Sequence, residues 1–72
     1  MNPADLLSVS VNGETRQWPM GSTIADVVAA LQLTGKRIAV ERNQEIVPRT
    51  EHGSTHLQAG DQVEIVQAIG GG

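Results

Sequence analysis

The absence of cysteine from a chain of only 72 residues constrains its fold more than any other feature of the sequence. A domain of this size buries only about 60% of the surface that its unfolded chain exposes, and small domains often depend on disulfides or bound metals. Without cysteine, disulfides and thiolate metal sites are both excluded. Trp18 is the only aromatic residue. We therefore expect one domain in which regular secondary structure surrounds an aliphatic core.

The charge and hydropathy of the chain argue against several classes of partner. A formal net charge of −3 and a single aromatic residue are unlike a nucleic-acid-binding surface, which needs a basic face and stacking platforms. No apolar run approaches the roughly 18 residues of a membrane span. Residues 1–5 lack the basic start and apolar centre of a signal peptide. These features predict a cytoplasmic protein that binds neither nucleic acid nor membranes.

The first part of the chain has the pattern of a β-hairpin. Residues 7–11 alternate between apolar and polar side chains, as in a strand with one buried face. Asn12-Gly13 follows, and it is the strongest short hairpin signal because both residues tolerate positive φ angles. Residues 14–18 are the returning strand, which Pro19 and Gly21 end.

A helix is predicted next. Thr23 and Asp26 have the spacing of a capping box, and Gly35 is placed to end the helix. Between them, apolar residues recur at the spacing that forms a single helical stripe. These residues are Ile24, Val27, Val28 and Leu31.

The second half of the chain reads as strands joined by turns. Residues 37–42 alternate, Asn43-Gln44 is a turn, and residues 45–47 form a short strand that Pro48 ends. A polar loop or short helical turn spans 50–57, with Leu57 as its apolar anchor, and residues 62–67 form the last strand. We summarise this order as ββαββ. It predicts a two-layer α+β domain in which a mixed sheet packs on one helix.

The candidate catalytic and metal-binding side chains all have simpler explanations. His52 and His56 have a zinc-compatible spacing, but the expected glutamate is missing and Gly53-Ser54 disfavours a helix, so we interpret them as solvated loop residues. Asp61 follows Gly60 and is interpreted as a turn residue. The serines lack a nucleophile elbow. We therefore predict no catalytic residue, no metal and no cofactor.

The arginines and the C-terminal residues are instead candidates for contact with a partner. Arg37, Arg42 and Arg49 read individually as solvated charges, and with Lys36 they make a candidate basic edge. If the third and last strands are neighbours, Ala39, Val66 and Ile69 form an exposed apolar strip of the kind that marks an interface. Residues 68–72 can reach roughly 17 Å when extended. On composition alone, this segment is either a frayed terminus or a substrate for a partner.

Three segments of the chain resemble a known family. They are 43–49 (NQEIVPR), 57–65 (LQAGDQVEI) and the terminal Gly71-Gly72. Together they resemble the sulfur carrier proteins of thiamin biosynthesis, which belong to the ubiquitin-like β-grasp proteins. The resemblance implies a β-grasp domain over residues 1–67 and a flexible tail over 68–72. It also implies that the chain is a carrier and not an enzyme.

The resemblance further implies a chemical role for the tail. An E1-like adenylating enzyme would activate the Gly72 carboxylate, a sulfur donor system would convert it to a thiocarboxylate, and thiazole synthase would use that sulfur. Gly70 and Gly71 would pass into the partner active sites. Partner contacts are expected at Ala39, Val66, Ala68 and Ile69. Three alternatives stay open at this point: a sulfur carrier for molybdopterin or another pathway, a ubiquitin-like protein modifier, and a binding module with an inert tail.

Overall fold

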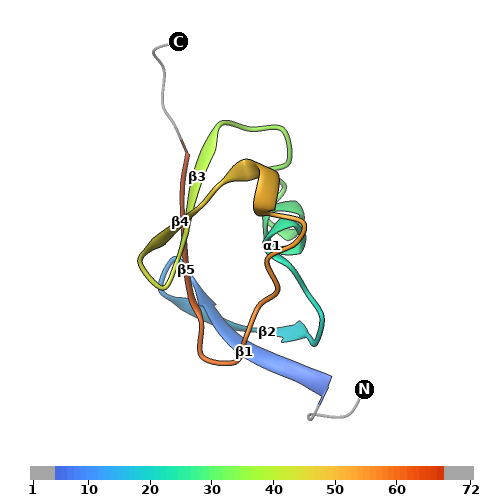
Figure 1. Cartoon of the computed structure of the whole chain (residues 1–72). Coiled ribbons are helices and arrows are strands. Elements are labelled where there is room, and N and C mark those ends of the chain that lie inside the picture. The colour runs from blue at the N-terminus through green and yellow to red at the C-terminus, as the bar shows by residue number, and fades with distance from the viewer. Residues whose placement is uncertain (1–4, 68–72) are drawn as a thin grey trace.

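The computed structural model describes residues 5–67, which form a mixed sheet with one α-helix packed on one of its faces (Figure 1). The elements, in chain order, are β1 (Leu6–Val11), β2 (Glu14–Pro19), α1 (Ile24–Ala30), β3 (Ile38–Arg42), β4 (Glu45–Val47), the 3₁₀ helix η2 (Arg49–Glu51) and β5 (Gln62–Gln67). The predicted α+β class is confirmed. The order ββαβββ roughly fits the predicted summary ββαββ, which counted one strand fewer after the helix although strands at 37–42, 45–47 and 62–67 were each predicted.

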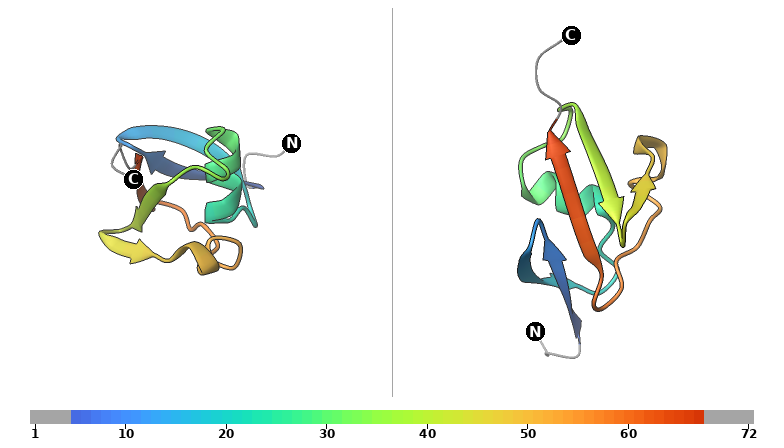
Figure 2. Two further views of the ribbon diagram at one scale, coloured as in Figure 1. Left: turned by 90° about the horizontal axis from the view of Figure 1, so that it is seen from above. Right: turned by 90° about the vertical axis from the view of Figure 1, so that its left-hand side faces the viewer.

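The last strand lies in the middle of the sheet. The strand order is β2-β1-β5-β3-β4, so β5 has a neighbour on each side (Figure 2). It runs parallel to β1, with Val11 opposite Val63, and antiparallel to β3, with Val40 opposite Ile65. The N-terminal hairpin and the β3–β4 hairpin are therefore joined into one sheet through β5.

Two tight turns set the register of the hairpins. Asn12 and Gly13 have φ angles of 52° and 83°, and Asn43 and Gln44 have 53° and 70°. Positive φ at both central residues is typical of the type I′ turn, whose twist matches that of the paired strands. Asn12 also contributes through its side chain, because its Oδ1 accepts the Ile65 backbone N–H at 2.7 Å. Both predicted turns are thus confirmed.

The helix begins as predicted but ends earlier. Thr23 Oγ1 accepts the Asp26 N–H at 3.3 Å, and Asp26 Oδ2 accepts the Thr23 N–H at 2.8 Å, which completes the capping box. The prediction that Gly35 ends the helix is wrong. The helix stops at Ala30, and Gln32 has a φ of 60°. The Leu33 N–H then reaches back to the Val28 carbonyl at 3.0 Å, the pattern of a Schellman C-cap, so Gln32 takes the position that usually favours glycine.

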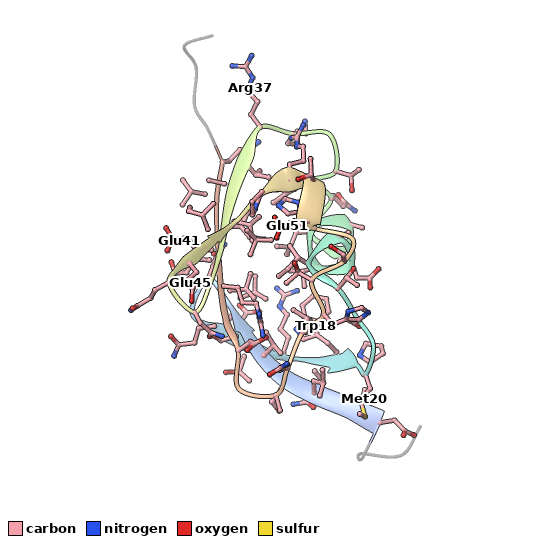
Figure 3. All side chains as sticks on the ribbon, viewed as in Figure 1. Trp18, Met20, Arg37, Glu41, Glu45 and Glu51 are labelled. Carbon is pink, nitrogen blue, oxygen red and sulfur yellow. The ribbon has the colours of Figure 1, made fainter. Side chains whose placement is uncertain are left out.

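The core lies between α1 and the sheet. It is largely aliphatic, as expected, but Trp18 is also part of it and is only 7% exposed, so the prediction of a purely aliphatic core is wrong (Figure 3). A ring of this size replaces several smaller side chains in a small core. The other buried apolar residues are Val9, Val11, Ile24, Val27, Val28, Val40, Val47, Leu57, Val63 and Ile65.

A buried carboxylate fixes the start of β5. Asp61 is 5% exposed, and its Oδ2 accepts Arg42 Nε at 2.8 Å and the Gln58 N–H at 2.8 Å. Its Oδ1 accepts Asn43 Nδ2 at 3.0 Å. Burial by itself raises the pKa of Asp61, but the hydrogen bonds from Arg42, Asn43 and Gln58, with the Arg42 charge, outweigh it and leave the pKa below its ordinary value. The turn role of Asp61 is confirmed, while Arg42 is an ion-pair partner and not a solvated charge.

Replacing this carboxylate tests its contribution. We expect Asp61→Asn to lower the free energy of unfolding by about 1–3 kcal/mol, because Arg42 loses its charged acceptor. A lowered folded-state pKa means that the ionised carboxylate stabilises the fold above the unfolded-state pKa of about 3.9, and that this stability is lost as the pH falls through the folded-state value. The difference in unfolding free energy between the parent protein and Asp61→Asn should therefore be largest above about pH 5 and should shrink in more acidic solution.

Urea unfolding followed by fluorescence measures this gap, since Trp18 is the only fluorescent aromatic side chain. Glu14→Gln is the matched control, because it removes an exposed ion pair with Arg16 and should have almost no effect. An equal loss of stability in both variants, or a difference in unfolding free energy that does not shrink as the pH falls below about 5, would contradict the role assigned to Asp61.

Candidate functional site

The residues expected to carry the chemistry divide into two groups. Gly70, Gly71 and Gly72, with Ala68 and Ile69, lie outside the described residues. Ala39 and Val66 lie within them. The site geometry that can be described is therefore that of the sheet surface around Ala39 and Val66. Val66 lies on β5, the strand that precedes residues 68–72.

Ala39 and Val66 are neighbours on the sheet face that α1 does not cover. They are direct cross-strand partners between β3 and β5, and both are exposed, Val66 by 64%. Alternation explains this, because Val40 and Ile65, the next residues along, are buried in the core. The condition set for the apolar strip, that its two strands be adjacent, is thus met for this pair.

The same face carries three further residues that the predicted strip did not include. Glu41 lies opposite Glu64 on β5 and opposite Ile46 on β4, and all three are exposed. Ile46 is 63% exposed although it is a large aliphatic residue. We call the five residues Ala39, Glu41, Ile46, Glu64 and Val66 the outer sheet patch. Only the observed β3–β4 and β3–β5 registers bring them together.

The histidines do not form a common site. His52 is half-buried, and its Nε2 lies 3.1 Å from the Val47 carbonyl oxygen, so it is not the solvated residue that we predicted. Its backbone carbonyl also accepts the Ala25 N–H at the start of α1. His56 is exposed and forms an isolated β-bridge with Thr23. Within the part of the chain that the structure describes, no three histidine or acidic side chains are grouped to hold a metal ion.

The candidate basic edge is also broken up. Arg42 is committed to Asp61, and Arg49 donates through Nη2 to the Lys36 carbonyl at 2.6 Å. Arg42 and Arg49 are therefore engaged in contacts within the domain. In residues 5–67, no helix is both long enough and apolar enough to cross a bilayer.

Comparison with known proteins identifies the family. The model of the ThiS family matches residues 9–72. The chain belongs to the ThiS family. The sulfur carrier protein ThiS of Bacillus subtilis is 37% identical over 65 residues, which are 89% of this chain and 98% of that protein. The ThiS of Escherichia coli is 30% identical over 66 residues and is covered completely.

A solved structure agrees with this assignment. The crystal structure of a thiamine biosynthesis protein (ThiS) from Geobacter metallireducens superposes with a TM-score of 0.71 at 27% identity, and the match covers 92% of this chain and 100% of that one. The predicted β-grasp fold is thereby confirmed. The relatives from Bacillus subtilis and Escherichia coli are both named sulfur carrier proteins, as the resemblance implied for the family.

Some relatives are much longer than this chain. The thiazole synthase of Paramagnetospirillum magneticum is 36% identical over 66 residues, which are 92% of this chain but 20% of that protein. The chain thus spans about a fifth of the length of such relatives. A ThiS-like segment in these proteins shares one polypeptide with the remainder of a thiazole synthase.

The exposure of Val66 predicts that substituting it has little effect on the free energy of unfolding. Val66→Asp should lower the free energy of unfolding by about 1 kcal/mol or less, because the side chain already faces water and only the proximity of Glu64 and Glu41 opposes the new charge. Ile65→Asp, one residue away, should cost several times more and unfold most of the protein, because it places an unpaired charge in the core. Urea midpoints measured by fluorescence compare the two. Equal losses would mean that Val66 is not exposed.

Proposed function

We propose that this chain carries sulfur for thiazole formation as a thiocarboxylate on Gly72. The observation that supports this most directly is the reach of the family match, which continues through the last residue, Gly72. In the sequence, residues 68–72 directly follow β5, which runs to Gln67.

The chemistry of the tail requires a partner enzyme. A terminal carboxylate has a pKa of about 3.3–3.7, so Gly72 is ionised at neutral pH and is a poor electrophile. In the adenylation step a Gly72 oxygen attacks the α-phosphorus of ATP, and pyrophosphate leaves. In the next step sulfur at the oxidation level of sulfide attacks the acyl carbon, and AMP leaves with the oxygen. The product is a thiocarboxylate, which thiazole synthase consumes.

The contribution of the carrier is reach and recognition. Gly70 and Gly71 have no Cβ, so their backbone can adopt almost any φ and ψ angles. Without side chains, this part of the chain can also enter a narrow channel in a partner. Residues 68–72 span roughly 17 Å when extended, enough to place the carboxylate well inside a partner. Because adenylation consumes ATP, we place the reaction in the cytoplasm.

Three partners follow from this scheme: an E1-like adenylating enzyme, a sulfur donor system and thiazole synthase. Those thiazole synthases that contain a ThiS-like segment support the last of them, because the segment and the rest of the enzyme are covalently joined there. On the carrier, we assign Ala39 and Val66, with Ala68 and Ile69 of the tail, to the contact with these enzymes.

Intact mass spectrometry tests the proposal. The protein is incubated with its adenylating enzyme, ATP and a sulfur source, and we expect an exchange of one oxygen for sulfur located on the last peptide. A variant that lacks Gly72 and a variant with one residue added after it are the controls, and both should stay unmodified while remaining folded. A carrier without Gly72 that still supported thiazole formation would refute the proposal.

The surface assignment has a separate test. Val66→Asp should weaken the affinity for the adenylating enzyme and for thiazole synthase by at least about tenfold each, since it places a charge in an apolar contact. Met20→Asp is the matched control, because Met20 is 60% exposed and is not part of the outer sheet patch. Calorimetry or surface plasmon resonance measures both. If Val66→Asp binds as tightly as Met20→Asp, the strip is not an interface.

A further inference from the structure

A small cavity lies on the face of the sheet that α1 covers, opposite to the outer sheet patch. It has a volume of about 230 Å³ and is formed by α1, residues 33–36, the start of β3 and the region of η2 (Figure 1). Its apolar lining consists of Ala25, Val28, Leu33 and Ile38, which are buried or half-buried. Ligand pockets usually have volumes of about 300–1,000 Å³, so this smaller cavity suits a side chain or a short peptide segment.

The cavity is basic, although the chain as a whole is acidic. Lys36 and Arg49 both contribute to its lining, and both are exposed. The lining that residues 5–67 provide includes no aspartate or glutamate, while the whole chain has a formal net charge of −3. A cavity that combines aliphatic and cationic groups is complementary to a ligand that combines an apolar group with a carboxylate.

Hydrogen bonds to the backbone hold the two cations together. Arg49 Nη2 donates to the Lys36 carbonyl oxygen at 2.6 Å, which uses one of the five N–H donors of the guanidinium group. The Lys36 N–H in turn donates to the Leu33 carbonyl at 3.0 Å, and Gly35 allows this turn with a φ of 81°. Two members of the candidate basic edge therefore meet at a cavity whose shape is set by the fold.

The cavity lies beside the end of β5. Ile38, which lines it, is the cross-strand partner of Gln67, the last residue of β5. The Cα atoms of such partners in antiparallel strands are about 4.5–5.5 Å apart. Residues 68–72 reach roughly 17 Å when extended. The segment that follows Gln67 is therefore long enough to cross the end of β3 and enter the cavity.

We propose that residues 68–72 bind in this cavity while the carrier is free. The Ile69 side chain contacts the aliphatic lining. The Gly72 carboxylate accepts charge-assisted hydrogen bonds from Lys36 and Arg49. The segment thus supplies both the apolar group and the negative charge that the cavity is suited to bind. The inference deepens the proposed function and rests on it for the free carboxylate of Gly72.

A weak contact is enough to populate this state. A segment attached so close to its site has an effective concentration in the millimolar range, so a dissociation constant of about 1 mM fills roughly half of the sites. A partner enzyme can therefore still withdraw the tail, and its apparent affinity falls only in proportion to the undocked fraction. Docking in the cavity sets the fraction of carriers whose Gly72 is accessible to that enzyme.

NMR of the full chain tests the inference by comparing the parent protein with a semisynthetic form in which Gly72 ends in a carboxamide. We expect the backbone amide shifts of Gly35, Lys36 and Arg49 to differ between the two forms, because the carboxamide lacks the charge that the cavity binds. Ile69→Ser should reduce this difference, because it removes the apolar contact and leaves both cations in place.

Substitution of the cations separates a bound tail from a general effect of charge. Lys36→Gln keeps the backbone carbonyl that Arg49 binds, so it should reduce the shift difference without moving the turn. Lys36→Gln/Arg49→Gln should abolish the difference. Arg16→Gln is the matched control, because Arg16 is an exposed cation that pairs with Glu14 outside the cavity, and it should leave the difference unchanged.

Three results would overturn the inference. Shift differences confined to residues 70–72 would mean that the carboxylate does not reach the cavity. Differences that persist in Lys36→Gln/Arg49→Gln would remove the cations from the contact. Differences that grow with protein concentration would assign the cavity to the tail of a second copy. An adenylation assay on the parent protein is independent of these measurements, so a docked tail that is never adenylated refutes the proposed function alone.

Discussion

The Asp61 carboxylate is the interaction on which the rest of the structure depends. It accepts hydrogen bonds from Arg42 at the end of β3, from Asn43 in the turn that follows and from the Gln58 backbone before β5. The Asp61 carbonyl also accepts the Ser10 N–H of β1. One residue therefore ties the first residues of β5 to both of its neighbouring strands. In a domain without cysteine, such hydrogen bonds and ion pairs connect separate segments that disulfides would connect in other small domains.

The consequence of this tie is a last strand that is paired on both sides. Val63 and Ile65 anchor β5 in the core, while Glu64 and Val66 face outward. The alternation divides one strand of six residues into a structural face and a recognition face. The side chains that hold the fold together and those that we assign to partners thus differ, so surface substitutions can test recognition without unfolding the domain.

Local signals in the sequence predicted most of the elements. Asn12-Gly13 and the Thr23–Asp26 capping box depend only on neighbouring residues, and both are found as expected. The missed features are long-range. Arg42 and Asp61 are 19 residues apart, so nothing local distinguishes their ion pair from two solvated charges. The predicted strip did not include Ile46 for the same reason, since Ile46 meets Glu41, and Glu41 meets Glu64, only through strand register. The role of Gly72 came from family resemblance, not from any physical pattern.

The central, parallel position of β5 also affects how the chain is made. Its contacts with β1 join residues separated by more than 50 positions, and they cannot form until the C-terminal part has been synthesised. A chain truncated before β5 lacks the strand that unites the two hairpins, together with two of the five residues of the outer sheet patch and the tail. Such a chain therefore cannot complete the five-stranded sheet. The topology thus makes completion of the sheet depend on the last strand to be synthesised.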